Sequence, residues 1–172
     1  MKINFLTKKG FTLIELLLYV SLSSVLLIST SFFMSTLLEA RIKNQTIAEV
    51  EQQGLQIMQV ITQTIRNAES INTPTQGIIA NTLSVNTYDI NINPTVFEVV
   101  GNVLRIKEGS NPAIDLLNSK VKITDMNFSN LMRPGTPGSI RVEFVLSYVN
   151  NIGRNEFDYS KKFTNTATLR QP

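Results

Sequence analysis

The sequence of 172 residues contains no cysteine and no histidine. Without cysteine the chain forms no disulfide, and it offers no thiol for a lipid anchor. Without histidine it lacks the central residue of the serine triads, of the usual zinc sites and of imidazole acid–base catalysis. Its aspartates and glutamates are scattered and match no calcium-loop pattern. We therefore expect no enzymatic activity, no bound metal and no cofactor.

An excess of positive charge is also lacking once the first ten residues are set aside. The formal net charge is +3, but three of the 16 basic residues are Lys2, Lys8 and Lys9, so 13 basic and 13 acidic residues remain after Gly10. Beyond Ser70 the sequence holds ten basic and eight acidic residues. This balance is too even to indicate an electrostatic surface for nucleic acid.

Glycine and proline are both absent from Phe11 to Gln53, and no charged residue lies between Leu16 and Leu38. As a helix, the uncharged run is long enough to cross a bilayer core of about 30 Å. The positive charge before the run exceeds that after it. The positive-inside rule therefore places the N-terminus in the cytoplasm and most of the chain outside.

Two other kinds of segment share some of these properties. A cleaved secretory signal needs an apolar region of about 7–15 residues and a small-residue exit site, whereas the run here is longer and the first alanine of the chain is Ala40. A plain membrane anchor fits the length. A plain anchor does not account for Glu15 at the start of the run. A carboxylate inside a membrane costs about 2.5–3.5 kcal/mol on insertion scales, and a plain anchor has no use for it that would offset this cost.

The residues around this carboxylate read Lys8-Lys9-Gly10-Phe11-Thr12-Leu13-Ile14-Glu15. This string resembles the cleavage and methylation site of bacterial type IV prepilins and type II secretion pseudopilins. The resemblance implies that a prepilin peptidase/methyltransferase cuts after Gly10 and methylates the new N-terminal residue, Phe11. It also implies that Glu15 takes part in filament assembly.

The resemblance gives Glu15 a physical role. Cleavage creates an α-amino group on Phe11, and in the family this amine pairs with the carboxylate of a neighbouring subunit. Two opposite charges relieve each other's burial cost in hydrocarbon, so Glu15 would set the register between subunits. The alternative is that Glu15, only four residues into the mature chain, reaches the lipid headgroups without a partner subunit.

A helical pattern continues beyond the apolar run. Its apolar stripe consists of Ile47, Val50, Gly54, Met58, Ile61 and Ile65, widened by Leu55, Ile57 and Val60. Gly54 costs about 1 kcal/mol of helix propensity, but it would allow a strand to pack closely. We expect the helix to run from about Thr12 to about Ala68 and to end before Pro74.

After Pro74 the pattern becomes that of strands. The expected strands are 77–85, a hairpin over 95–108 with Gly101-Asn102 at its turn, 121–128, 140–148 and 161–169. From Ile140 to Tyr148 every second residue is apolar, and Arg141, Glu143 and Ser147 lie between them, as in a half-buried antiparallel strand. Lys161 and Lys162 suit an edge strand.

One long helix followed by antiparallel strands predicts the α+β class, with one sheet packed on the exposed half of the helix. The pilin fold implied by the resemblance has this arrangement. We divide the chain into a leader peptide (1–10), a transmembrane helix half (11–38), an amphipathic helix half (39–69) and an antiparallel β domain (70–172). The string from Arg66 to Ile71 also resembles the helix end of J-type pseudopilins and of PilW-type minor pilins.

The expected function is that of a prepilin-like subunit, a minor pilin or pseudopilin, of a type IV pilus or a type II secretion pseudopilus. The implied partners are the peptidase/methyltransferase, other pilin or pseudopilin subunits, an inner-membrane assembly platform and the lipid bilayer. The chain would lie first in the inner (cytoplasmic) membrane and then in the filament. Its Glu15 argues against the outermost tip position, where the carboxylate would have no subunit above it.

Two alternatives remain open at this point. One is a tip, DNA-uptake or adhesive pilin whose β domain binds nucleic acid or a surface. Clustering of five basic residues on one face would favour it: Arg133, Arg141, Arg154, Lys161 and Lys162. The other is a membrane-anchored enzyme, which would need a cleft lined by convergent carboxylates.

Overall fold

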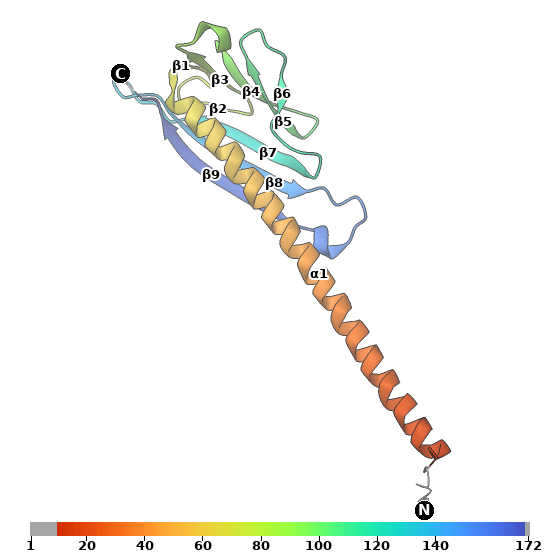
Figure 1. The fold of residues 1–172 in the computed structure, drawn as a ribbon. Coiled ribbons are helices and arrows are strands. Elements are labelled where there is room, and N and C mark those ends of the chain that lie inside the picture. The colour runs from red at the N-terminus through yellow and green to blue at the C-terminus, as the bar shows by residue number, and fades with distance from the viewer. Residues whose placement is uncertain (1–9, 171–172) are drawn as a thin grey trace, which may run out of the picture. The chain divides into compact units, whose positions relative to one another are not determined.

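The computed structural model describes residues 10–170, so most of the expected leader peptide lies outside the described residues. The described chain forms one long helix, α1 (Leu13–Arg66), followed by nine strands and two short 3-10 helices (Figure 1). The strands are β1 (Ala68–Thr73), β2 (Ile79–Ala80), β3 (Leu83–Thr87), β4 (Thr95–Val100), β5 (Val103–Glu108), β6 (Ile114–Asp115), β7 (Val121–Asn130), β8 (Ser139–Tyr148) and β9 (Ser160–Thr168). The 3-10 helices are η1 (Ile90–Ile92) and η2 (Asn155–Phe157).

The contacts of the chain divide it into two compact units, which we describe separately. The first unit ends at Arg41 and holds the first part of α1. The second begins at Ile42 and holds the remainder of α1 and all the strands of the described chain. In the first unit each described residue is exposed, whereas the second contains the hydrophobic core.

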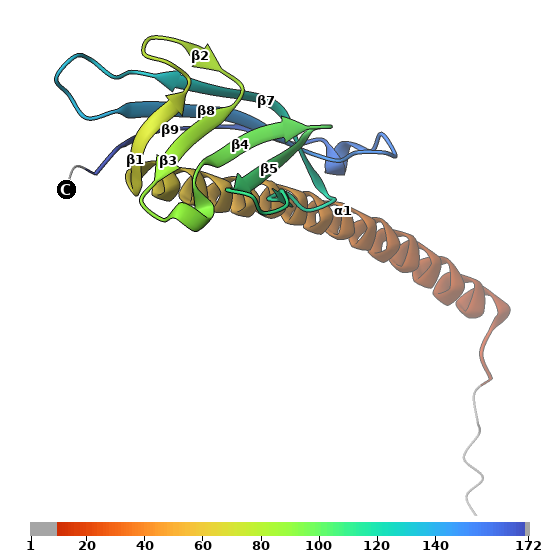
Figure 2. The ribbon, with the colours of Figure 1, turned by 90° about the horizontal axis from the view of Figure 1, so that it is seen from above.

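The strands form two antiparallel sheets, in the orders β1-β3-β4-β5-β6 and β2-β7-β8-β9. Figure 2 shows both sheets on one side of the part of α1 that belongs to the second unit. The predicted α+β class, with a long helix packed on antiparallel strands as in a pilin, is confirmed. The prediction of one sheet is wrong, because β2 pairs with β7 whereas β3 pairs with β1 and β4.

The apolar stripe of α1 joins both sheets in one core. Its most deeply buried members are Val50, Ile57, Ile61 and Ile65, and they share the core with Phe97 and Leu104 of the first sheet and Phe128, Phe144 and Leu146 of the second. Leu55, which the pattern assigned to the stripe, is instead 65% exposed. The helix thus completes the core that neither sheet closes alone.

The helix ends at Arg66, two residues before the predicted end. Ala68 is the first residue of β1, where it is buried and pairs with Thr87 of β3. The backbone N–H of Arg170 donates to the carbonyl of Arg66 at 3.0 Å. This bond satisfies one of the carbonyl groups that every helix leaves open at its C-terminus.

Gly54 brings α1 and β9 together. The ring of Phe163 occupies the space in which a Cβ of residue 54 would stand. The same ring stacks on Phe144 of β8, with 5.3 Å between the ring centroids. The predicted close approach of a strand at Gly54 is therefore confirmed, and β9 is the strand that makes it.

The hairpin and the edge strand follow the sequence pattern. Gly101 and Asn102 have φ values of 58° and 66°, and a two-residue type I′ turn requires positive φ at both positions. In β8, Ile140, Val142, Phe144 and Leu146 are buried, as the alternation predicts. β9 lies at the edge of its sheet, and β8 is its neighbour.

Charged residues of α1 bind the β segments rather than only water. The Nζ of Lys43 donates to the carbonyl of Asp158 at 2.6 Å and to that of Asn155 at 3.2 Å, just before β9. Glu49 accepts a hydrogen bond from the side-chain amide of Asn118, in the segment before β7. These polar contacts hold the irregular ends of the second sheet against the helix.

A third charged residue of α1, Glu51, forms an ion pair with Lys161 of β9 at 2.6 Å and accepts a hydrogen bond from Tyr159 at 3.3 Å. The hydrogen bond from Lys161, together with its charge, lowers the pKa of Glu51 from its ordinary value of 4.5. The ion pair therefore favours the folded state when Glu51 is ionised.

Replacement of Gly54 by alanine is expected to lower the free energy of unfolding by about 1–2 kcal/mol. Because three atoms of the Phe163 ring would lie within 2.5 Å of the new Cβ, overpacking should cost about 2–3 kcal/mol, the upper part of its usual range. This cost exceeds the gain of about 1 kcal/mol in helix propensity. Denaturant unfolding of the full chain in detergent, followed by circular dichroism, measures the change. Adding Phe163→Leu should recover part of the loss, and Gln52→Ala on the exposed face should cause none. A Gly54→Ala variant as stable as the parent would contradict the contact.

Acid should destabilise the chain partly through Glu51. Because the folded-state pKa of Glu51 is depressed, its contribution is present above the unfolded-state pKa and is lost as the pH falls through the lower folded-state value. Glu51→Gln should therefore make stability less sensitive to acidification below about pH 5, as measured by thermal unfolding at a series of pH values. Lys161→Met should have the same effect, and the double variant no further one. If the unfolding temperature of Glu51→Gln fell with acidification as steeply as that of the parent chain, the ion pair would not contribute to stability in the predicted way.

Candidate processing and assembly site

The helix begins inside the motif that the sequence singles out. The backbone N–H of Glu15 donates to the side-chain oxygen of Thr12 at 3.3 Å, and the N–H of Leu16 donates to the Thr12 carbonyl at 3.1 Å. Thr12 is therefore the N-cap of α1, at the spacing from Glu15 that defines a capping box. This capping role of Thr12 was not among the predictions, although a threonine three residues before a glutamate and an apolar run is its signature.

Gly10 and Phe11 precede the helix and are exposed. A Cβ placed on Gly10 would meet nothing within 4 Å, so the described chain does not need glycine there for its own packing. The ring of Phe11 approaches the edge of the Tyr19 ring, with 6.0 Å between the centroids.

The carboxylate of Glu15 makes no hydrogen bond and no ion pair with any residue from 10 to 170. It lies in the first turn of α1, where the positive end of the helix dipole favours a negative charge. Phe11, whose amine is the implied counter-charge, lies four residues before it. The structure thus brings the three predicted site residues together at the start of α1 and leaves the carboxylate available to an external partner.

Within the described residues, α1 is the one helix long and apolar enough to cross a membrane. None of its most apolar stretch is buried within the chain, unlike the core helix of a soluble protein. Ile28 and Phe32, for example, are 70% and 73% exposed. Apolar surface of this extent calls for lipid or other polypeptides to cover it.

Most hydroxyl side chains in this part of α1 bond back to the helix. Ser21, Ser24, Ser29, Thr30 and Thr36 donate to carbonyls three or four residues earlier. Ser31 and Ser35 make no such bond within the described chain, and they line a shallow hollow of about 500 Å³ on the helix surface. Small residues spaced by four let helices approach each other closely in lipid.

Two neighbouring basic residues of β9 lie on opposite faces of the second sheet. Lys161 pairs with α1, whereas Lys162, the next residue of β9, pairs with Glu143 of β8 at 3.0 Å, and successive residues of a strand point to opposite faces. Arg154 pairs with Glu156. Carboxylates therefore offset three of the five positive charges that would have indicated a nucleic-acid surface.

The described residues contain no group of three or more side chains placed to hold a metal ion. Two carboxylates, those of Asp89 and Glu108, line one pocket of the β domain. Asp89 is the N-cap of η1, since its Oδ1 accepts from the backbone N–H of Asn91 at 2.9 Å. One of the two carboxylates therefore has a structural task in the loop.

Comparison with protein families identifies the N-terminal end of the chain. Residues 6–31 match the family model of the prokaryotic N-terminal methylation motif. Comparison with curated proteins and with solved structures gave no match. The motif supports a type IV pilin or pseudopilin precursor and indicates a structural subunit rather than an enzyme. The chain thus carries the N-terminal methylation motif of type IV prepilins and pseudopilins on a pilin-like α+β fold, and the recognition made from Gly10, Phe11 and Glu15 is confirmed at the level of that motif.

Proposed function

We propose that the chain is a prepilin-like subunit that is cut after Gly10, methylated on Phe11 and assembled through Glu15 into a type IV pilus or a type II secretion pseudopilus. One observation carries the proposal. The methylation motif coincides with an exposed apolar helix whose first turn holds a carboxylate with no partner in the described chain.

Processing uses the exposed segment before the helix. Gly10 and Phe11 lie outside the hydrogen-bonded part of α1, so a peptidase can bind their backbone without unwinding a helix. The open space around Gly10 agrees with a glycine selected by a peptidase pocket rather than by the fold. The basic leader places this bond on the cytoplasmic side of the inner membrane, where the same enzyme methylates Phe11.

Assembly uses the charge that processing creates. The new α-amino group of Phe11 stands at the N-terminal end of α1, where the helix dipole disfavours a positive charge. A carboxylate from a neighbouring subunit offsets this cost, and the amine offsets the cost of placing Glu15 in hydrocarbon. Because the pair forms only between subunits aligned in one register, Glu15 fixes the axial alignment of neighbouring subunits.

We assign the subunit to the minor class, of the J-type or PilW-type, and to a position below the outermost tip. The Arg66 to Ile71 string and the pairing requirement of Glu15 support these two assignments. Its β domain stays outside the inner membrane, and its partners are the assembly platform and other subunits. The pairing of Arg154, Lys161 and Lys162 with carboxylates favours assembly over binding of nucleic acid.

Co-expression with a prepilin peptidase should remove residues 1–10, and Gly10→Val should block the removal because the added branched side chain occupies the space that the peptidase needs for close backbone contact. Intact-mass measurement of the membrane-extracted chain gives the result, including the methyl group on Phe11. Thr7→Val, which changes the leader away from the scissile bond, is the matched control and should be cut normally. A mature chain that begins anywhere other than Phe11 would overturn the proposed processing.

Glu15→Leu should leave membrane insertion and cleavage after Gly10 intact, because the segment becomes more apolar and the scissile bond is unchanged. Incorporation into filaments should fall about tenfold or more, since an unpaired buried charge costs more than 1.4 kcal/mol. The measurement is the ratio of sheared-filament protein to membrane protein. Glu39→Leu, at the other end of the apolar run, is the control. An unchanged ratio for Glu15→Leu would show that Glu15 only reaches the headgroups.

A further inference from the structure

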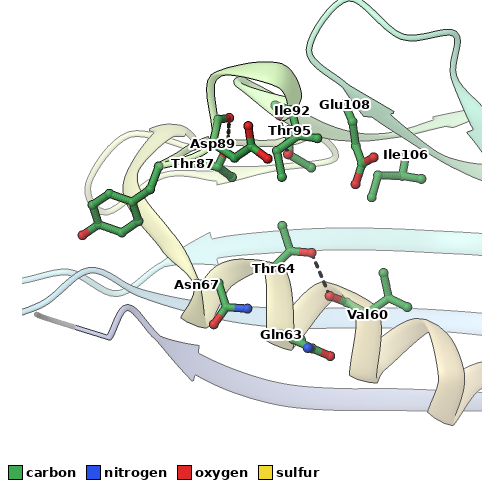
Figure 3. Close-up of a pocket in the computed structure, with 11 residues that line it drawn as sticks. Val60, Gln63, Thr64, Asn67, Thr87, Asp89, Ile92, Thr95, Ile106 and Glu108 are labelled. Carbon is green, nitrogen blue, oxygen red and sulfur yellow. Dashed lines mark hydrogen bonds between the residues drawn. The ribbon is translucent and has the colours of Figure 1, made fainter.

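A pocket of about 460 Å³ lies within the second unit, between the last turns of α1 and residues of β3, β4, β5 and η1. Figure 3 shows Glu108 and Ile106 of β5 facing Val60 and Thr64 of α1 across this pocket. Three segments far apart in the sequence build it. Each of them is fixed by the core or by a cap, so the pocket is part of the fold and not a gap between mobile loops.

The pocket has a negative electrostatic character. Asp89 and Glu108 both line it, and no lysine or arginine does. Asp89 uses Oδ1 to hold η1, but the half-buried carboxylate of Glu108 forms no hydrogen bond and no ion pair within residues 10–170. Asn67, the residue that follows the end of α1, also lines the pocket, and the C-terminal end of a helix carries negative partial charge.

The other lining residues determine what kind of cation fits. Val60, Ile92 and Ile106 give the pocket an apolar wall, against which an aliphatic stem can pack. Tyr88, which is 62% exposed, adds an aromatic ring, and arginine stacks on aromatic faces and binds carboxylates with its planar fork. Gln63 of α1 also lines the pocket, and its side-chain amide can form hydrogen bonds with a peptide backbone.

We propose that this pocket binds an arginine side chain presented by a neighbouring polypeptide. The guanidinium group lies against Glu108 and Asp89, and the aliphatic stem lies against Ile92 and Ile106. The identification of the neighbour as another subunit of the filament rests on the proposed function. The binding chemistry itself does not, because it requires only the folded second unit.

The test is a titration of the unassembled full-length chain in detergent micelles, followed by the isoleucine methyl signals in NMR spectra. The probe is the peptide acetyl-Ala-Arg-Ala-amide. The same peptide with citrulline in place of arginine has nearly the same shape without the charge, and putrescine represents a free polyamine. We expect saturable shifts at Ile92 and Ile106 with the arginine peptide, weaker binding of both other probes, and no shifts at the buried core residue Ile140.

Glu108→Gln should weaken binding of the arginine peptide by about threefold or more, the effect of losing one partly exposed ion pair. Glu98→Gln, on the neighbouring strand outside the pocket, should leave the affinity unchanged. Asp89→Asn keeps an oxygen to cap η1 and provides a second test should Glu108→Gln disturb the fold. The proposal would be overturned if the citrulline peptide or putrescine bound as tightly as the arginine peptide. It would also be overturned if neither Glu108→Gln nor Asp89→Asn changed the affinity for the arginine peptide. Because no filament is needed, this result is independent of the tests of Gly10 and Glu15.

Discussion

The uncovered apolar surface of the first part of α1 is the constraint on which the rest of the structure depends. From Leu13 to Leu38 the described residues provide no cover for it, so it calls for lipid or sister helices. Neither environment supplies water, and each backbone group must therefore be bonded within the helix. This requirement explains the absence of proline, which has no backbone N–H to donate, and the hydroxyl groups of Ser21 and Ser24 that bond back to the helix. The absence of glycine is consistent with its low helix propensity.

The second part of α1 meets the opposite requirement, because there the helix must leave room for other elements to close a core. Gly54 is the first glycine of the helix, and it lies where the Phe163 ring packs. That ring stacks in turn on Phe144, so one missing side chain on α1 sets how closely β9, and with it β8, approaches the helix. The ion pair of Glu51 with Lys161 fixes the same strand at a neighbouring point.

Local patterns predicted local elements well. The positive φ angles at Gly101 and Asn102 and the alternating burial of β8 follow from residue types within a few positions of each other. Assignment to a sheet did not follow, because it depends on distant partners. The predicted strand 77–85 is two strands in different sheets, since Ile79 pairs with Ser129 of β7 and Leu83 with Phe97 of β4.

The helix end shows the same limit. Nothing in the residues around Arg66 distinguishes one more helical turn from a strand, and the pairing of Ala68 with Thr87 decides it. The candidate processing site could be read from the sequence because its residues are contiguous. The pocket around Glu108 could not, since its walls come from three separate segments, at residues 60–67, 87–95 and 106–108, that only the fold brings together.

The two carboxylates that matter most for the proposals share one property. Within the described residues every buried polar side-chain atom has a partner, and most other charges face water, where an unpaired charge costs little. Glu15 begins an apolar segment, and Glu108 is half-buried beside an apolar wall. Each therefore gains more from a cationic partner than a surface carboxylate would, and neither finds that partner within residues 10–170. On the proposed function, pairing with a cationic group of a neighbouring subunit offsets the desolvation cost that each carboxylate bears in the free chain, and this gain favours assembly.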